Sequence, residues 1–237
     1  MITFNTKLLS VIKRTRNVKS FRFNLPEKVL FKPGQFFSVA IRVDGKEMAK
    51  YFSLSNSPTE TGYVEFTKRI TESSFSQALD KLKAGDKATL KMPFGSFTFC
   101  GEYDKIAFIS GGIGITPIRS ICKFLTDKKL PTDVVLLYGN STEEDIVFKE
   151  DFAEMEIANK NIKVFHTLTS PDVDKNKWKG LTGYIDESMI KEKIKDYKER
   201  VFFVCGPPRM VGGIIGILEN KLGIQKDKIR LENFAGY

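Results

Sequence analysis

A change of hydrophobic pattern near residues 100–104 constrains the fold more than any other feature of this sequence. Before it, short apolar or alternating runs predict β-strands, and only residues 74–82 have helical spacing. The predicted strands are 21–25, 35–41, 51–55, 63–69 and 87–92. Turn signals such as Pro33-Gly34 separate them. We therefore expect a small antiparallel β-barrel or sandwich over residues 1–101.

After Tyr103, predicted strands and helices alternate along the chain. The strands are 105–110, 133–139, 162–168 and 200–206, and the helices are 118–128, 150–158, 188–197 and 210–223. Strands that alternate with helices form parallel sheets covered on both faces. We therefore expect a second, Rossmann-like α/β domain over residues 102–237.

The excess of positive over negative charge lies entirely in the first predicted domain. The 237 residues hold 38 Lys and Arg against 29 Asp and Glu, a net charge of +9. Residues 1–50 hold 11 basic and 3 acidic side chains, residues 51–100 hold 6 and 5, and the remainder holds 21 of each. This excess indicates a basic solvated surface, a phosphate-bearing ligand, an acidic protein partner, nucleic acid or an anionic membrane.

Cysteine and histidine content excludes several kinds of site. Cys100, Cys122 and Cys205 are odd in number and widely spaced, so we expect no disulfide framework, zinc site, iron–sulfur cluster or other metal centre. The single histidine, His166, argues against histidine-based triads, and we expect it to be structural. Apolar runs are too short for a membrane-spanning helix, and no secretory signal is evident, so a cytoplasmic location is expected.

Two glycine-bearing turns follow predicted strands of the α/β region. In residues 110–120, SGGIGITPIRS, the glycines permit a tight turn and close approach of a phosphate, and Thr116 is placed to cap the following helix. The second turn, CGPPRM at 205–210, ends the strand RVFFVC. Because ligands bind at the carboxyl ends of parallel strands, the two turns together indicate one extended ligand, with a tight connection and a rigid loop as the alternatives for each turn alone.

Eight segments together resemble the ferredoxin–NADP reductase superfamily, in the order of that family. They are PGQFF (33–37), KYFSLSNSP (50–58), TKRITESSFS (67–76), AGDKATLKMPFGSF (84–97), GGIGITP (111–117), LLYGNSTEEDI (136–146), CGPPRM (205–210) and LENFAGY (231–237). The resemblance implies an N-terminal Greek-key β-barrel that binds flavin and a C-terminal α/β domain that binds a nicotinamide nucleotide.

The resemblance also implies flavin-binding residues. Lys50 stands in the place of a family arginine that meets the flavin phosphate, Phe52 in the place of a tyrosine that packs on the isoalloxazine, and Ser53 near flavin N5. Ser76 matches a hydroxyl that binds a flavin phosphate. The other implied flavin-binding residues are Tyr51, Thr67, Lys68, Ser74 and Phe75.

Nucleotide-binding residues follow from the same resemblance. Gly112, Gly114 and Thr116 would lie along the pyrophosphate, and Cys205 and Gly206 would lie beside the nicotinamide, with a buried apolar role as the alternative for Cys205. The remaining implied cofactor-binding residues are Gly139, Asn140, Phe234 and Tyr237. Either Phe234 or Tyr237 would cover the flavin. Residues with implied roles in hydride transfer are Ser53, Cys205, Glu232 and Phe234.

The implied activity is hydride transfer from NADH or NADPH to FAD, with FMN as the alternative flavin, followed by electron transfer to a protein acceptor such as ferredoxin or flavodoxin. Residues 139–148 contain no arginine for a 2′-phosphate, and Glu143 and Glu144 would repel one, so NADH is favoured. The alternative is an electron-transfer or regulatory subunit without independent turnover. Nucleic-acid binding is not favoured, because the sequence contains no recognisable nucleic-acid-binding module. In an electron-transfer reductase, the excess positive charge would bind an acidic protein partner.

Overall fold

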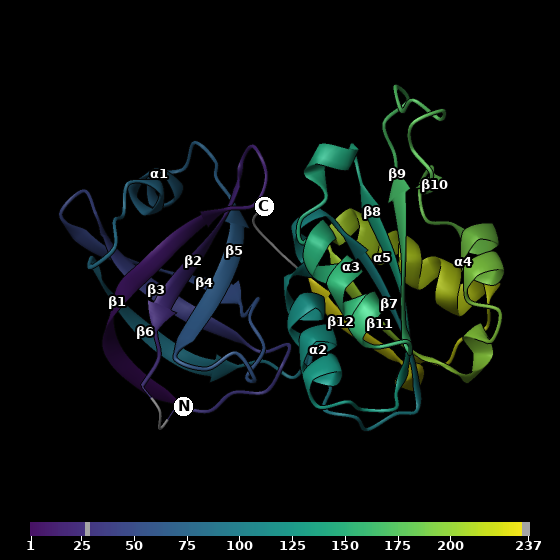
Figure 1. Ribbon diagram of the computed structural model, residues 1–237, viewed down its shortest axis with the longest axis horizontal. Helices are drawn as coiled ribbons and strands as arrows, with labels where there is room; N and C mark the ends of the chain where they lie inside the picture. The colour runs from purple at the N-terminus through teal and green to yellow at the C-terminus, as the bar shows by residue number, and fades with distance from the viewer. Residues whose placement is uncertain (27–28, 234–237) are drawn as a thin grey trace. The chain divides into compact units, whose positions relative to one another are not determined.

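The computed structural model describes residues 1–26 and 29–233 and divides into two compact units (Figure 1). The first unit holds Met1–Cys100 together with Thr116–Asp127. The second holds Gly101–Ile115 and the chain from Lys128 onward. The segment Thr116–Asp127 is helical, so one helix from the α/β part of the sequence groups with the N-terminal strands.

The first unit is built on a six-stranded antiparallel sheet. Its strands are β1 (Ile2–Lys13), β2 (Val18–Asn24), β3 (Phe36–Val43), β4 (Lys46–Ser53), β5 (Tyr63–Arg69) and β6 (Lys87–Phe94). Their order is β4-β3-β6-β1-β2-β5. An isolated antiparallel bridge from Leu54 to Phe66 links the end of one edge strand to the other edge strand. The sheet therefore closes on itself, which confirms the barrel rather than the sandwich.

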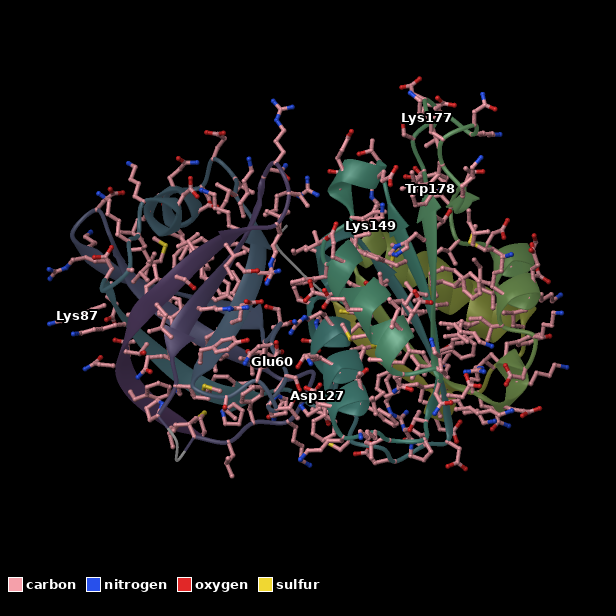
Figure 2. The ribbon with its side chains drawn as sticks, in the orientation of Figure 1. Glu60, Lys87, Asp127, Lys149, Lys177 and Trp178 are labelled. Carbon is pink, nitrogen blue, oxygen red and sulfur yellow. The ribbon has the colours of Figure 1, made fainter. Side chains whose placement is uncertain are left out.

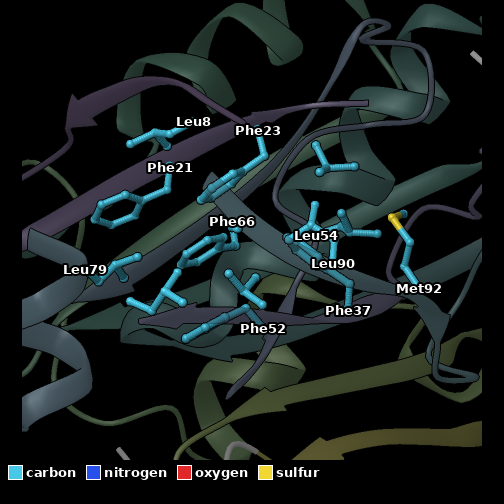
Figure 3. Packing of buried hydrophobic residues seen from close by; sticks show 14 of the residues in the cluster. Leu8, Phe21, Phe23, Phe37, Phe52, Leu54, Phe66, Leu79, Leu90 and Met92 are labelled. Atoms are coloured by element: carbon cyan, nitrogen blue, oxygen red, sulfur yellow. The ribbon is translucent and has the colours of Figure 1, made fainter. Parts of the chain in front are cut away.

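Aromatic side chains fill the barrel (Figure 3). The fully buried ring of Phe66 stacks on Phe52 with centroids 4.3 Å apart, and on Phe21 at 5.2 Å. Helix α1 (Ser74–Asp80) adds the buried Phe75 and Leu79, and it begins after Ser73, whose side chain accepts from the Ser76 amide. Inward alternation of apolar residues along the strands produces this core.

The strand β1 is longer than any predicted strand and was not among the predicted runs. It pairs with both β2 and β6, so it is central to the barrel. Its register with β2 shifts between Leu8 and Ser10, where a β-bulge interrupts the pairing. The even-numbered residues from 4 to 12 still face inward on both sides of the bulge, but the inward Thr6 and Ser10 are polar and the outward Leu9 and Val11 are apolar, and this removes the period-two signal from the sequence.

The second unit is built on a six-stranded sheet in which every pairing is parallel. Its strands are β7 (Lys105–Gly111), β8 (Asp133–Asn140), β9 (Ile162–Leu168), β10 (Leu181–Thr182), β11 (Val201–Gly206) and β12 (Ile229–Asn233). The order β10-β9-β8-β7-β11-β12 confirms the Rossmann-like fold. The chain reverses its direction of progress across the sheet between β7 and β11, the place where such sheets bind ligands.

Helices cover this sheet as its apolar strands require. They are α3 (Lys149–Ala158), α4 (Glu187–Lys193) and α5 (Pro208–Gly216). Residues of α4 and α5 pack with Ala107, Ile109, Val135 and Leu137 of the sheet. Figure 1 shows α3 on the opposite face from α5. The helix predicted over 210–223 is divided, because a π-helical segment, Ile217–Lys221, follows α5.

The helix that groups with the barrel is α2 (Ile115–Asp127), which follows the 3₁₀ turn Gly112–Gly114 directly. Within residues 1–26 and 29–233, no helix is both long and apolar enough to span a bilayer. The same residues contain no cluster of three His, Cys, Asp or Glu side chains suited to a metal ion.

Candidate functional site

The two predicted glycine turns lie in direct contact at the carboxyl ends of β7 and β11. A Cβ atom on Gly114 would lie 2.6 Å from Gly206 Cα and 2.7 Å from the Cys205 carbonyl oxygen. Only glycine therefore fits at Gly114. The fold thus brings together two segments that are far apart in sequence, as ligand binding by both turns requires.

The first turn has the backbone of a phosphate cradle. Gly112 has φ +52°, in the left-handed region that glycine adopts without strain. Tyr138 fixes the turn, because its hydroxyl donates to the Gly112 carbonyl at 2.9 Å. The helical backbone already begins at Gly112, so Thr116 lies inside α2 and is buried, and the expectation that it caps the helix is wrong.

Unpaired polar side chains lie at the ends of the two central strands. The Asn140 side chain, at the end of β8, is 6% exposed, and neither its amide oxygen nor its amide nitrogen has a hydrogen-bond partner in the described part of the chain. The buried Ser110 hydroxyl, at the end of β7, is also unpaired there. Buried polar groups are nearly always satisfied, so these two are available to a ligand. Asn140 was predicted with its neighbour Gly139, whereas Ser110 was not.

Cys205 and Glu232 are neighbours on adjacent strands, β11 and β12. Burial raises the pKa of the Cys205 thiol well above its ordinary value, with a further contribution from Glu232. Burial also raises the pKa of the Glu232 carboxyl to about 7. Cys205 is therefore an uncharged thiol at neutral pH, and Glu232 is half protonated. The predicted Phe234 and Tyr237 lie outside the described residues.

A methionine that sequence reasoning missed joins the two turns. A Cβ on Gly111 would lie 2.5 Å from Met210 Sδ, and a Cβ on Gly206 would lie 2.8 Å from Met210 Cε. The Met210 side chain therefore occupies the space that both glycines leave open. The only sequence signal was its place at the end of the CGPPRM segment.

Lys68 in the first unit is a buried cation whose hydrogen bonds go to neutral groups. It is 6% exposed, and its Nζ donates to Ser76 Oγ at 2.9 Å and to the Arg69 carbonyl at 2.7 Å. Burial lowers the pKa of Lys68 to about 8. A phosphate would supply the missing negative charge, so Lys68 and Ser76 fit the pyrophosphate of FAD. Ser76 Oγ also accepts from the Thr71 amide at 2.9 Å.

The residues predicted to bind the flavin at the end of β4 differ in their exposure to solvent. Lys50 and Tyr51 are exposed, whereas Phe52 and Ser53 are buried. One face of the Phe52 ring stacks on Phe66, so a flavin ring could pack only on the other face. The packing of Phe52 on a flavin stays a prediction. On α1, Ser74 is exposed and Phe75 is buried, with the Phe75 ring centroid 5.9 Å from that of Phe52.

Thr67 belongs to a buried polar network that the sequence did not predict. Its Oγ1 lies 2.6 Å from Ser20 Oγ and 2.9 Å from Ser55 Oγ. At the centre of the network is Glu65, 1% exposed, which accepts from Ser55 Oγ at 2.9 Å and from Arg22 Nε at 2.7 Å. A glutamate within the apolar run YVEFTKR was the available signal. Thr67 is thus engaged within the barrel.

The segment after β8 carries the acidic residues expected near the nucleotide ribose. Glu143, Glu144 and Asp145 form a short 3₁₀ turn capped by Thr142. Lys149 Nζ lies 2.5 Å from Glu143 Oε1, so the nearby positive charge is already neutralised. Figure 2 shows the position of Lys149 on the second unit.

His166 lies on β9 beside Tyr138, with ring centroids 5.7 Å apart. Burial, with a smaller contribution from Lys149, lowers the pKa of His166 to about 4. The imidazole is therefore neutral at physiological pH, and its Nδ1 has no hydrogen-bond partner among the described residues.

Comparisons with known proteins agree with this architecture. Residues 5–99 match the oxidoreductase FAD-binding domain, and residues 108–215 match the oxidoreductase NAD-binding domain. The chain therefore contains both domains of a flavoprotein oxidoreductase. It belongs to the ferredoxin–NADP reductase superfamily.

Two curated relatives match most of this chain. One component of the Na⁺-translocating NADH-quinone reductase of Pseudoalteromonas atlantica is 30% identical, over 93% of this chain and 57% of its own length. The reductase component of the glycine betaine monooxygenase of Chromohalobacter salexigens is 28% identical, over 98% of this chain and 64% of its own. The chain thus spans about three fifths of the length of these relatives.

Solved structures share the fold. The cytochrome b5 reductase domain of Ulva prolifera nitrate reductase has a TM-score of 0.85 and 23% identity, over 98% of this chain and 97% of that one. A ferredoxin NADP⁺ reductase from Neisseria gonorrhoeae with bound FAD and NADP has a TM-score of 0.81 and 20% identity, over 98% of both chains.

Proposed function

We propose that this chain is an NADH-dependent reductase that takes a hydride into bound FAD and passes electrons to an acidic protein acceptor such as ferredoxin or flavodoxin. Residues 1–101 hold the flavin and residues 102–237 hold the nucleotide. The observation that carries the proposal is the contact between Gly114 and Gly206, because it joins two glycine turns into one cradle beside Cys205.

The residues of the chain would act by binding and orienting. Lys68 and Ser76 hold the flavin phosphates, and the amides of Gly112 and Gly114 face the nucleotide pyrophosphate. When bound, FAD accepts a hydride and releases single electrons. Cys205 stays uncharged and so gives the nicotinamide ring a neutral neighbour.

Glu232 would serve proton exchange. Its pKa of about 7 means that it can hold or release a proton near neutral pH. Asn140 would contribute hydrogen bonds to the nucleotide, because both polar atoms of its buried side chain lack partners among the described residues.

The preference for NADH rests on charge. Glu143, Glu144 and Asp145 would repel a 2′-phosphate, and Lys149, the nearby cation, is paired with Glu143. A 2′-hydroxyl carries no such penalty and can donate to a carboxylate.

The acidic partner is proposed from the charge of the barrel. Lys7 of β1 lies directly opposite Lys87 of β6, and Thr3 lies opposite Lys91. All three lysines are exposed, and Figure 2 shows Lys87 pointing away from the barrel. Like charges placed side by side are tolerated where an anionic partner neutralises them. Steep salt dependence of electron transfer is expected.

A second candidate is a flavin- and nucleotide-binding component that turns over only within a larger complex. Both curated relatives are named as subunits and extend well beyond the part matched here. In that case NADH would reduce the bound flavin, but the isolated chain would pass electrons to no small acceptor.

The test is to load the purified protein with FAD and to record its visible spectrum during anaerobic addition of NADH or NADPH. Bleaching of the flavin near its absorption maximum, faster with NADH, is expected. Ferricyanide turnover then separates the independent reductase from the component that depends on a complex. If the protein binds neither FAD nor FMN, both candidates are contradicted.

A further inference from the structure

Helix α2 is bound to the segment that follows β4. Its residues Thr116–Asp127 group with the barrel, although they continue directly from the Gly112–Gly114 turn of the second unit. The barrel segment concerned is residues 54–60, called the 54–60 segment below, which begins immediately after Ser53.

Arg119 is the main contact between α2 and the 54–60 segment. Its guanidinium forms an ion pair with Glu60, and the two side chains are 7% and 15% exposed. Arg119 Nη1 also donates to the Ser55 carbonyl at 3.2 Å. One residue further along the helix, Ser120 Oγ donates to the Asn56 carbonyl at 2.6 Å. Two successive residues of the helix therefore bind three positions of the segment.

A second contact lies at the end of the same helix. Thr59 Oγ1 donates to Asp127 Oδ2 at 2.5 Å, and Asp127 also binds Lys123 at 2.5 Å. Figure 2 shows Glu60 and Asp127 close together. Arg119 and Asp127 are about two helical turns apart, roughly 12 Å along the axis. Attachment at two such points prevents α2 from pivoting on the segment.

The other side of the 54–60 segment is fixed to β5. The Ser55 amide donates to the Glu65 carbonyl at 2.8 Å, and the Glu65 amide donates to Asn56 Oδ1 at 2.8 Å. The buried Glu65 carboxylate is itself held by Arg22. The barrel, the segment and α2 therefore form one hydrogen-bonded piece, with Ser53 at its edge.

We propose that the Arg119–Glu60 ion pair is a positioning pair for hydride transfer. It holds the 54–60 segment on α2 within the first unit, and so fixes the backbone that follows Ser53, the residue expected near flavin N5. The inference rests on the proposed function, in which the turn binds the nucleotide and the barrel binds FAD. A displacement of about 1 Å between reacting groups can lower a rate about 100-fold.

Because the Arg119–Glu60 ion pair is buried, both partners must be replaced together to test its role. Removing one partner of a buried ion pair leaves an uncompensated charge, which can unfold a protein, whereas removing both partners is often neutral. The informative variant is therefore the double substitution Arg119→Met with Glu60→Gln. A matched control is Lys191→Met with Glu187→Gln, which removes an exposed helical ion pair of α4.

The experiment measures the FAD-loaded proteins by anaerobic stopped flow with NADH, and the apoproteins by amide hydrogen exchange. In the double variant we expect FAD binding within about twofold of the unaltered protein, a limiting flavin-reduction rate lowered about 10- to 100-fold, and faster exchange in 54–60 and 116–127. The control should change neither rate nor exchange. The single variant Arg119→Lys, which keeps the positive charge beside Glu60, should retain most of the reduction rate of the unaltered protein.

Two results separate failure of this inference from failure of the proposed function. If the unaltered protein binds FAD and NADH reduces it, but the double variant reduces equally fast, the positioning pair is disproved and the function stands. If FAD in the unaltered protein is not reduced by NADH or NADPH, the proposed function is disproved. Unchanged exchange in 54–60 and 116–127 would also disprove the positioning role.

Discussion

Cys205 of β11 lies in register with Glu232 of β12, so that a thiol and a carboxyl are paired across two parallel strands at the edge of the nucleotide turns. Burial raises the pKa of both groups. The pair therefore presents uncharged or half-protonated groups where a nicotinamide ring is proposed to bind.

The first prediction concerns the pH dependence of stability. Unfolded Glu232 releases its proton near the ordinary value of 4.5, and the folded protein retains it up to about 7. The folded state thus binds more protons over this interval, and its free energy of unfolding falls as the pH rises from about 4.5 to 7. Glu232→Gln has no carboxyl to titrate, so its free energy of unfolding should not show this fall. The stability of the variant relative to the unaltered protein should therefore rise by roughly 1–3 kcal/mol between pH 4.5 and 7.

Chemical denaturation of the apoproteins at several pH values checks this. Glu154→Gln, at an exposed position of α3, is the control and should follow the unaltered protein. A constant difference between Glu232→Gln and the unaltered protein over pH 4.5–7 would mean that the carboxyl is not buried as described.

The second prediction concerns Lys68. Lys68→Met should weaken FAD binding about 10-fold or more, because a charge-assisted hydrogen bond contributes roughly 1.5–3 kcal/mol. The apoprotein should not lose stability, since burial of an uncompensated ammonium is unfavourable. Isothermal titration with FAD measures the effect, and Lys91→Met, at an exposed position on β6, is the control.

The pH profile of FAD binding gives an independent reading of the same site. Free Lys68 loses its proton above about pH 8, and phosphate binding requires the proton to return. The affinity of the unaltered protein for FAD should therefore fall as the pH rises through about 8, and that of Lys68→Met should not. Equal profiles would remove Lys68 from the flavin site.

The third prediction separates two glycines. Gly114→Ala places a methyl group 2.6 Å from Gly206 Cα, a backbone atom that cannot rotate away. We expect a loss of about 1–3 kcal/mol in stability, together with weaker NADH binding. Gly213→Ala, in α5, adds a Cβ that meets no described atom beyond its own helix within 4 Å, and it should be neutral or stabilise by about 0.5–1 kcal/mol. Thermal unfolding and NADH titration compare the two variants, and equal behaviour would contradict the contact between the turns.

The fourth prediction concerns the choice of nucleotide. Glu143→Gln removes one repelling charge and frees Lys149 from its ion pair. We expect the ratio of kcat/KM for NADPH to that for NADH to rise roughly 5- to 10-fold, as about 1 kcal/mol of exposed electrostatics allows. Steady-state kinetics with both nucleotides measures it, with Glu192→Gln on α4 as the control. A preference for NADPH in the unaltered protein would contradict the premise.

The sequence predicted the two-part architecture because its signals were local. The strands at 63–69 and 162–168 match β5 and β9 to the residue, since an uninterrupted apolar or alternating run ends at clear turn residues. Strands β1, β10 and β12 were not recognised. In β1 the alternation is hidden because apolar Leu9 and Val11 face outward, and β12 is a five-residue run that is supported by its pairing with β11.

The sequence alone determined which residue types could form a phosphate cradle, because glycine freedom and the order of strand and helix are properties of short segments. Only the tertiary structure decided which distant groups meet. It set Gly114 against Gly206, placed Met210 over both turns, buried Lys68 beside the neutral Arg69 carbonyl and Ser76 hydroxyl, and bound α2 to the barrel through Arg119 and Glu60. These contacts join residues far apart in the chain, and their energies come from burial and register, which no local pattern encodes.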